Sequence, residues 1–317
     1  MAKIKTLKTM KPYLDACICV PHQETLSSNL VELGWSILES NPVPKSYCEG
    51  YQTQFLTETI FVSPHQPSGR IILLTCAEPA TPMQSKIDPY EYGGWFDLDI
   101  RTKDNYALHS IVTSQFAWKT NCPPQEWVFG PFRVVEFLSC NDFGLTVAAM
   151  QRVDPPLPNP PPGHYGDFFN SSFLVPDVKP AIDFFQSVLQ CQVVLHEHIT
   201  LANHPLRNVL GITRDEDAVL ELVLLKGRGG YMVEPIALHH SKLPKINYTR
   251  KSNTSPPYLG LYAIRIYEEN ISEIEKLASQ HSYINQIKKI ENGLLLFTAD
   301  DAWLEIYDSS VFNSVSS

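Results

Sequence analysis

The chain has 317 residues, of which 44% are hydrophobic and 11% aromatic, and its formal net charge is −9. This length suffices for two domains of ordinary size, and this composition suffices for a sizeable core. The acidic balance and the lack of a long Lys/Arg-rich run argue against nucleic acid or an anionic membrane as a partner. No apolar stretch approaches the length of a membrane span, and the basic start is not followed by an apolar segment, so we expect neither a membrane anchor nor a signal peptide.

The cysteines indicate a reducing compartment. Their number, seven, is odd, and none of them has the C-x-x-C spacing of a metal site. We interpret them as reduced thiols, which predicts a cytoplasmic protein.

A unit that is repeated four times organises the chain, with copies that start near Leu14, Phe96, Phe169 and Leu259. Each copy opens with a short alternating strand that leads into an amphipathic helix, and further strands follow. A repeated supersecondary unit fixes the architecture before any motif is considered.

The first two copies show this pattern clearly. The first predicts a strand over 15–20 and a helix over 24–33, with Gly34 as its C-terminal stop. In the second, Leu98 and Ile100 form one face of a strand. Asp104 is then a good N-cap for the helix that follows.

A proline-rich segment lies near the midpoint of the fourfold repeat. Residues 154–163 contain six prolines, which excludes a helix or a central strand and predicts a semi-rigid polyproline linker. We therefore predict an N-terminal domain over 1–153 and a C-terminal domain over 164–317, each built from two units.

The third and fourth copies complete the pattern. Asp177 is expected to cap a helix with Pro180 in its first turn, and the fourth copy predicts a strand from Leu261 and a helix over 271–279. Later strands are predicted over 70–75, 128–138, 145–150, 193–199, 218–225, 293–298 and 302–307. One helix against a sheet, four times over, predicts an α+β fold whose concave sheet faces are free to line a cavity.

At this point the residues resemble a known superfamily. A strand that ends in Val-Pro-Asp, followed by an Ala-Ile-x-Phe-Phe helix between Val175 and Phe185, is similar to the βαβββ module of the vicinal oxygen chelate superfamily. That group includes glyoxalases, bleomycin-resistance proteins and extradiol dioxygenases. The segments at Val20 and at Trp303 look similar. The resemblance covers nearly the whole chain and implies two domains, each a pair of βαβββ modules that form a half-open, barrel-like sheet around a cavity.

The resemblance also implies where metal ligands would lie, at the start of a module's first strand and in its last strand. The four first-strand positions hold Asp15, Asp97, Asn170 and Leu261. The last-strand positions hold Leu73, Ala148, Glu221 and Glu305. Because a non-haem iron oxygenase needs two imidazoles and one carboxylate, the lack of histidine argues against an extradiol dioxygenase, and it puts a nickel- or zinc-type glyoxalase site in doubt.

The first candidate site lies in the C-terminal half, where Asn170, Glu221 and Glu305 are expected to face one cavity. Two carboxylates and an amide oxygen suit Mg²⁺ or Mn²⁺. Without a metal, crowded carboxylates divide into one base and one acid. The alternative is that each glutamate is neutralised by a structural partner such as Arg265.

Two aromatic residues belong to the same proposal. Trp303 and Tyr307 flank Glu305 at even spacing in a strand, so all three should share one face. The two rings are then either an aromatic wall for a ligand or part of the core.

A second candidate is His196 with His198, which share one face of the strand after the third helix. If that face is inward, the imidazoles could join Glu221 at one metal. The alternative is an exposed pair on the solvent face.

A third candidate lies in the N-terminal half. The charged residues expected on its concave face are Asp15, Asp97, Asp99 and Arg101, and Glu136 in an apolar strand is expected in the same cavity. An arginine beside carboxylates could hold an anionic substrate while one aspartate transfers a proton. The alternative is an internal salt-bridge network in a half kept as scaffold.

These patterns predict an enzyme that transforms a small organic substrate by acid–base chemistry, of isomerase, lyase or cyclase type. Glu305 and Glu221 would serve as base and acid or as metal ligands, with Asn170 orienting the substrate. A divalent metal (Mn²⁺ or Mg²⁺) or no cofactor fits this chemistry. One alternative is a binding protein that sequesters a ligand, as bleomycin-resistance proteins do, and another is a dioxygenase using His196 and His198. A homodimer stays open, because paired-module proteins can associate through their edges.

Overall fold

The computed structural model describes residues 14–63, 69–77, 87, 89, 93–213, 217–240 and 258–310. Within them the chain folds into four modules, each with a first strand, a helix and further strands. The first module comprises β1 (Leu14–Val20), α2 (Glu24–Glu32), β2 (Ser36–Pro42), α3 (Lys45–Tyr51), β3 (Phe55–Val62) and β4 (Gly69–Cys76). The second comprises β5 (Gly94–Thr102), α4 (Asn105–Ser114), β6 (Lys119–Thr120), β7 (Gln125–Phe129), β8 (Phe132–Cys140) and β9 (Thr146–Asp154).

The third and fourth modules repeat this order. The third comprises β10 (Tyr165–Leu174), α5 (Val178–Ser187), β11 (Gln192–Thr200), α6 (Pro205–Val209), β12 (Val219–Lys226) and β13 (Met232–His239). The fourth comprises β14 (Gly260–Glu268), α7 (Ile271–Ala278), β15 (Ile284–Ile290), β16 (Gly293–Thr298) and β17 (Trp303–Asp308). The predicted α+β fold with half-open sheets is confirmed.

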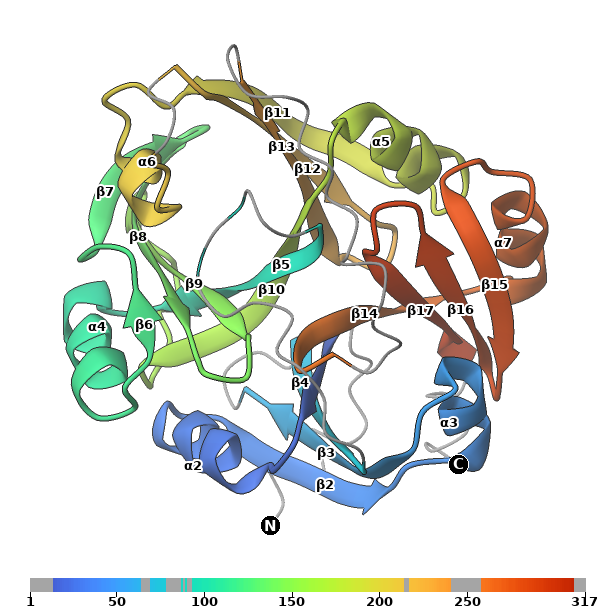
Figure 1. Ribbon diagram of the computed structural model, residues 1–317. Helices are drawn as coiled ribbons and strands as arrows, with labels where there is room; N and C mark the ends of the chain where they lie inside the picture. The colour runs from blue at the N-terminus through green and yellow to red at the C-terminus, as the bar shows by residue number, and fades with distance from the viewer. Residues whose placement is uncertain are drawn as a thin grey trace.

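The modules pair into two curved sheets (Figure 1). An eight-stranded sheet has the order β15-β16-β17-β14-β1-β4-β3-β2, and a nine-stranded sheet has the order β11-β12-β13-β10-β5-β9-β8-β6, with β7 paired to β8. In each sheet the first strands of two modules meet antiparallel at the centre, β1 with β14 and β5 with β10.

This pairing corrects the prediction that each half of the chain, 1–153 and 164–317, forms its own sheet. The first module pairs with the fourth, and the second pairs with the third. The proline-rich segment 154–163 therefore joins β9 to β10 within one sheet. The chain passes between the sheets where β4 is followed by β5 and where β13 is followed by β14.

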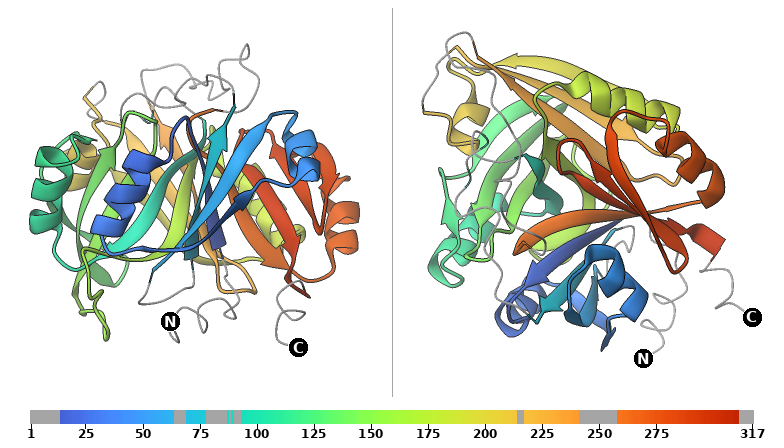
Figure 2. Two further views of the ribbon diagram at one scale, coloured as in Figure 1. Left: turned by 90° about the horizontal axis from the view of Figure 1, so that it is seen from below. Right: turned by 45° about the vertical axis from the view of Figure 1, so that its right-hand side comes forward.

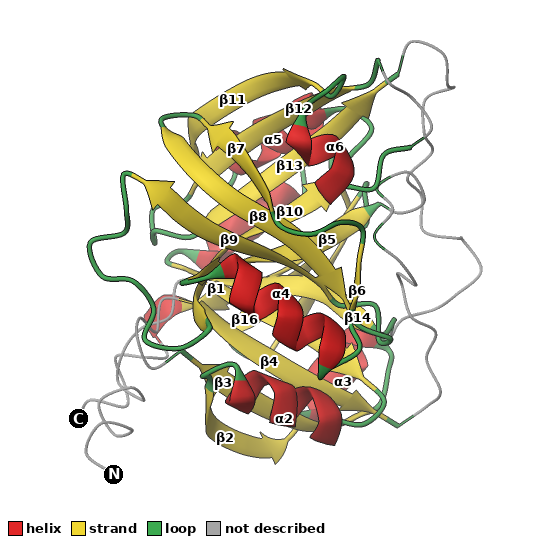
Figure 3. Ribbon diagram, turned by 90° about the vertical axis from the view of Figure 1, so that its left-hand side faces the viewer, coloured by secondary structure: helices red, strands yellow, loops and turns green. Residues whose placement is uncertain are grey.

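The four longer helices lie on the convex sides of the sheets, where the two sheets share one core. Figures 1 and 2 show α2 beside α4 and α5 beside α7, and Figure 3 shows the first of these pairs from the side. Apolar residues of both sheets and of all four helices form a single buried cluster. Each sheet thus has a covered convex face and a separate concave face, as alternation along a strand requires.

The junction of the two sheets is held by close backbone contacts. Trp95 Nε1 donates a hydrogen bond of 2.6 Å to the Trp303 carbonyl oxygen. Gly94 has a φ of +80°, and a Cβ there would lie 2.6 Å from the Asp301 carbonyl oxygen. Only glycine fits this conformation and this spacing.

Two predicted helix caps are confirmed. The Asp104 side chain accepts hydrogen bonds from the backbone N–H groups of Tyr106 and Ala107, at the start of α4. The Asp177 side chain accepts one from Lys179 N at the start of α5. In the described part of the chain, no helix combines the length and the apolar character that crossing a membrane requires.

The Asp104 cap gives a first prediction. Replacing Asp104 with alanine should lower the free energy of unfolding by about 1 kcal/mol, because two N–H groups of the first turn lose their acceptor. Urea unfolding followed by circular dichroism measures the change. Ser110→Ala, on the exposed side of the same helix, is the matched control and should cause no loss.

Candidate active site

The concave face of the eight-stranded sheet is filled by side chains. Helix α3 lies over it and contributes Tyr47 and Tyr51, which pack with Phe55, Tyr262 and Trp303 in one buried cluster. The Tyr51 and Tyr262 ring centroids are 5.3 Å apart in an edge-on arrangement. Trp303 is therefore a core residue in this cluster, one of the two alternatives left open by the sequence.

Glu305 lies at the centre of this face, fully buried and fully paired. Its carboxylate accepts hydrogen bonds from Tyr47 Oη at 2.5 Å, Tyr51 Oη at 2.8 Å and Arg265 Nε at 2.7 Å. The guanidinium of Arg265 in turn lies 4.5 Å from the centroid of the Tyr307 ring. The arrangement matches the alternative in which Arg265 neutralises the glutamate, and it leaves Glu305 no free oxygen for a substrate.

Asp15, on the same face, is also neutralised. Arg70 Nε and Nη2 donate to its two oxygens at 2.8 and 2.5 Å, a bidentate pair, and Tyr267 Oη donates at 2.5 Å. Such a closed pair orders the sheet but offers no free acid or base. Asp15 therefore belongs to a structural network, as the salt-bridge alternative supposed.

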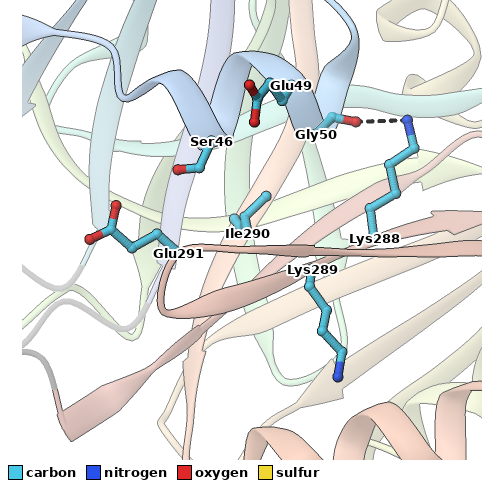
Figure 4. Close-up of a pocket in the computed structure, with 7 residues that line it drawn as sticks. All are labelled: Ser46, Glu49, Gly50, Lys288, Lys289, Ile290 and Glu291. Atoms are coloured by element: carbon cyan, nitrogen blue, oxygen red, sulfur yellow. Dashed lines mark hydrogen bonds between the residues drawn. The ribbon is translucent and has the colours of Figure 1, made fainter.

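A hollow at the edge of this sheet, by contrast, is open to solvent. It lies between α3 and β15, has a volume of about 740 Å³ and is wide open to solvent (Figure 4). Lys288 Nζ donates to the Gly50 carbonyl oxygen at 2.8 Å across it. Its other charged side chains, Glu49, Lys289 and Glu291, are exposed, so this hollow is a surface groove without a buried reactive group.

The concave face of the nine-stranded sheet holds a cavity with four carboxylates. They come from three strands of the sheet, and all are buried: Asp97 and Asp99 on β5, Glu136 on β8 and Glu234 on β13. An apolar wall completes the cavity: Trp127, Phe129, Leu138, Met150, Leu206, Leu210, Leu220, Leu222 and Ile236. No lysine, arginine or histidine of the described chain lines it.

Neutral donors hold three of these carboxylates. Asn170 Nδ2 donates to Asp99 Oδ2 at 2.6 Å, and Ser172 Oγ donates to Glu234 Oε2 at 2.8 Å. Trp127 Nε1 donates to Glu136 Oε2 at 2.8 Å.

Burial and mutual repulsion raise the proton affinity of the whole group. Burial raises the pKa of Asp99 to about 7, against the opposing effect of its hydrogen bond from Asn170. Burial and the charge of Asp99 raise the pKa of Glu136 to about 8. The same two causes hold the pKa values of Asp97 and Glu234 well above their usual range. Carboxylates that crowd in a dry site cannot all ionise, so near neutral pH this cavity contains both carboxylic acids and carboxylates.

Two further oxygens are buried without a hydrogen-bond partner, Asp97 Oδ1 and Asn170 Oδ1. A buried oxygen without a hydrogen-bond partner lowers the stability of the fold, and such atoms are typical of sites that bind a ligand or serve a reaction. The cavity itself measures about 40 Å³, which holds no more than a few water molecules.

A divalent metal ion fits this cavity in donor type but not in spacing. Carboxylate and amide oxygens are the ligands of Mg²⁺ and Mn²⁺. Among the described residues, however, no three of the cavity carboxylates have oxygens that all lie within 4.8 Å of one another; the one such cluster of His, Cys, Asp or Glu lies elsewhere. The groups available for chemistry in this cavity are therefore the carboxylates themselves.

The predicted trio of Asn170, Glu221 and Glu305 is not brought together, which corrects the first candidate site. Asn170 and Glu305 lie in different sheets. Glu221 on β12 points to the convex side, because its neighbours Leu220 and Leu222 line the cavity. His196 and His198 also point away from the cavity, since Leu195 and Ile199, which flank them in the strand, pack on the concave side.

Sequence reasoning missed Glu234, which occupies the position expected of Glu221. The last strand of the third module is β13, and no strand was predicted there. Its alternation of Val233, Glu234, Pro235 and Ile236 carried a signal, but a proline argues against a central strand. Pro235 is accommodated where β13 runs parallel to β10, opposite Phe173.

Arg101 is engaged at the end of the cavity strands rather than inside. Its Nε lies 3.4 Å from Asp167 Oδ2, and its guanidinium stacks 4.1 Å from the centroid of the Phe169 ring. Arg101 does not line the cavity, so among the described residues no arginine there could hold an anionic substrate.

The chain shares its overall fold with solved glyoxalase and dioxygenase structures, which confirms the resemblance at the level of the fold alone. A crystal structure of a glyoxalase I mutant from Zea mays is similar with a TM-score of 0.65 and 13% identity, covering 99% of each chain. Glyoxalase I from Zea mays itself gives 0.62 and 13%, covering 96% of this chain and 95% of that one. A putative dioxygenase from Bacillus subtilis gives 0.54 and 12%, covering 94% of this chain and 85% of the other.

Sequence comparison alone adds nothing to this. No family model matches the chain, and no curated protein is significantly similar to it. At 12–13% identity the structural likeness establishes the fold, whereas the function has to be argued from the site.

Proposed function

We propose that the cavity of the nine-stranded sheet is the active site of an enzyme that transforms a small organic molecule by proton transfer. The observation that carries this proposal is the convergence of four buried carboxylates in one cavity without a lysine, arginine or histidine among the described lining residues. Buried carboxylates with a structural role look different in this protein. In the other sheet, Glu305 and Asp15 each form an ion pair with an arginine. Uncompensated carboxylates in a cavity are typical of a site that handles protons.

The environments of the carboxylates assign their roles. With a pKa of about 8, Glu136 is mostly protonated at pH 7 and acts as the general acid. Asp99, with a pKa of about 7, is ionised in half of the molecules and acts as the base. A base and an acid with separated pKa values can remove a proton next to a carbonyl group while the carbonyl oxygen receives one. Isomerisation, elimination and ring closure all use this step.

The lining predicts the kind of substrate. The leucines, Trp127 and Phe129 favour an apolar body, and the carboxylates favour a neutral or cationic polar end over an anionic one. Since the cavity holds about 40 Å³, a substrate must displace side chains. Leu206 on the short helix α6 is the wall residue best placed to move, because α6 packs mainly on β7 at the edge of the site.

A substrate-independent experiment tests the basis of the proposal. Carboxyl carbons of Asp and Glu are labelled with ¹³C and titrated by NMR between pH 3 and 10, with Asp99→Asn and Glu136→Gln as assignment variants. We expect two resonances to titrate near 7 and near 8. Titration of both groups below pH 5 would remove the proposed acid and base.

Turnover is tested by hydrogen exchange. The protein is incubated in D₂O with a panel of small ketones and aldehydes, and deuterium uptake next to the carbonyl is followed by mass spectrometry. We expect exchange that falls by about 10²-fold or more in Asp99→Asn and Glu136→Gln. Glu126→Gln, an exposed glutamate on β7, is the matched control and should keep full activity. Compounds that stabilise the fold without any exchange would instead support sequestration of a ligand.

A further inference from the structure

Three imidazoles surround one carboxylate on the convex face of the nine-stranded sheet, the face opposite the cavity of the chemistry proposed above. His196 and His198 come from the edge strand β11, Glu221 from β12 and His239 from β13. In the sheet register His198 lies opposite Glu221, and His239 lies opposite Val219, two positions from Glu221. Residues two apart on a strand share one face, so all four side chains project from the same side.

The side chains already converge. Glu221 Oε1 lies 2.9 Å from His196 Nε2 and 3.5 Å from His198 Nε2, and Glu221 Oε2 lies 2.7 Å from His239 Nε2. The rings of His196 and His198 are stacked, with centroids 5.1 Å apart. The ligand atoms of His196, His198 and Glu221 all lie within 4.8 Å of one another, the one such cluster among the described residues.

We propose that His196, His198, Glu221 and His239 bind one divalent transition-metal ion, of the zinc or cobalt type. Two imidazole nitrogens and one carboxylate oxygen are already assembled, and His239, which contacts the other oxygen of Glu221, supplies a third imidazole beside this cluster. Imidazole and carboxylate are ligands that Zn²⁺ prefers, and imidazole also suits cobalt, nickel and copper. Mg²⁺ and Ca²⁺ are poor matches because they prefer oxygen ligands. The bound ion would replace the two hydrogen bonds that Glu221 accepts from His196 and His239, and it would tie together the three strands at this edge of the sheet.

The surroundings favour an ion over a simple hydrogen-bonded cluster. Glu221 is only 13% exposed, whereas the histidine side chains are 42–59% exposed, so the carboxylate forms a floor and the imidazoles form an open rim. A single carboxylate needs one partner for neutralisation, and three histidines from two further strands exceed that need. Exposure of the rim also gives an ion from solution direct access.

Binding is measured on the full-length chain with Zn²⁺ by calorimetry and with Co²⁺ by visible absorption, which reports four-coordinate geometry. We expect one ion per chain, and a loss of affinity of roughly 100-fold or more in His198→Ala and in Glu221→Gln. Equal melting temperatures of the variants in chelator establish that the fold is kept. His22→Ala, an exposed histidine of the first module, is the matched control and should bind normally.

Two outcomes would overturn the proposal. One is the absence of a stoichiometric Zn²⁺ or Co²⁺ site, or an affinity that His198→Ala and Glu221→Gln leave unchanged. The other is a site that Glu234→Gln abolishes while His198→Ala does not, because the ion would then lie in the carboxylate cavity. A metal site in the carboxylate cavity would also bring a metal into the proposed enzymatic reaction. The absence of a site at the histidines would leave the proposed reaction unaffected.

Discussion

Replacing Arg265 with methionine is expected to lower the free energy of unfolding by about 3–5 kcal/mol. The substitution leaves the fully buried carboxylate of Glu305 without its cation, 2.7 Å from where Arg265 Nε had been. Arg265 also lies 3.3 Å from Glu58 on β3, so a second acidic residue loses a partner. Removing one member of a buried pair is more damaging than removing both, because an uncompensated charge remains in the core.

Chemical denaturation of three variants checks this expectation. The double variant Arg265→Met with Glu305→Gln should recover much of the loss, since the buried charge is then gone. Arg133→Met is the control, because it removes an arginine from an ion pair in which both side chains are nearly half exposed. It should lower stability by less than about 1 kcal/mol. An equally small loss in Arg265→Met would contradict the structural role assigned to the eight-stranded sheet.

Replacing Glu136 with glutamine is expected to stabilise the protein by about 2–4 kcal/mol at pH 8 and by little at pH 4.5. The pKa of Glu136 is raised to about 8 in the folded chain, above its ordinary value near 4.5. Between these two values the folded state binds more protons than the unfolded state, so the stability of the natural protein falls as the pH rises. Glutamine cannot ionise, and its amide oxygen still accepts the hydrogen bond from Trp127 Nε1.

Thermal unfolding of both proteins over pH 4.5–8.5 measures this difference. The gap between the two curves should widen steadily with pH. Glu126→Gln controls for the loss of a charge at an exposed position and should change the free energy of unfolding by less than about 1 kcal/mol. A stabilising substitution that also abolishes proton exchange is the pattern expected of a carboxylate kept for function at the expense of stability. If the Glu136→Gln curve runs parallel to the natural one, the raised pKa is wrong.

Local features were predictable because they depend on neighbouring residues. Asp104 and Asp177 cap their helices as expected, since a side chain that accepts from N–H groups two or three residues ahead needs no distant partner. The pairing of Glu305 with Arg265 was named as an alternative. It could be anticipated because both residues lie in strands of the same module and on the same face.

Distant relationships were less accessible. The first strands of all four modules have the same alternating pattern, so nothing in them distinguishes pairing of neighbours from the observed pairing of first with fourth and second with third. The linker 154–163 was a real break in regular structure, but a break does not say which sheet the chain enters next. Glu234 was missed because Pro235 hid the strand that carries it.

By itself, then, the sequence determined the repeating βαβββ unit, the α+β class and the presence of acidic residues in apolar strands. These follow from alternation and helical periodicity, which are properties of short segments. Only the tertiary structure decided which carboxylates meet. Strand pairing and the curvature of each sheet place Asp97, Asp99, Glu136 and Glu234 around one cavity, enclose Glu305 among tyrosines and Arg265, and turn Glu221 outward to three histidines. A carboxylate is thus a proposed acid–base group in one place, a structural anion in another and a candidate metal ligand in a third, because burial and neighbouring charges set its chemistry.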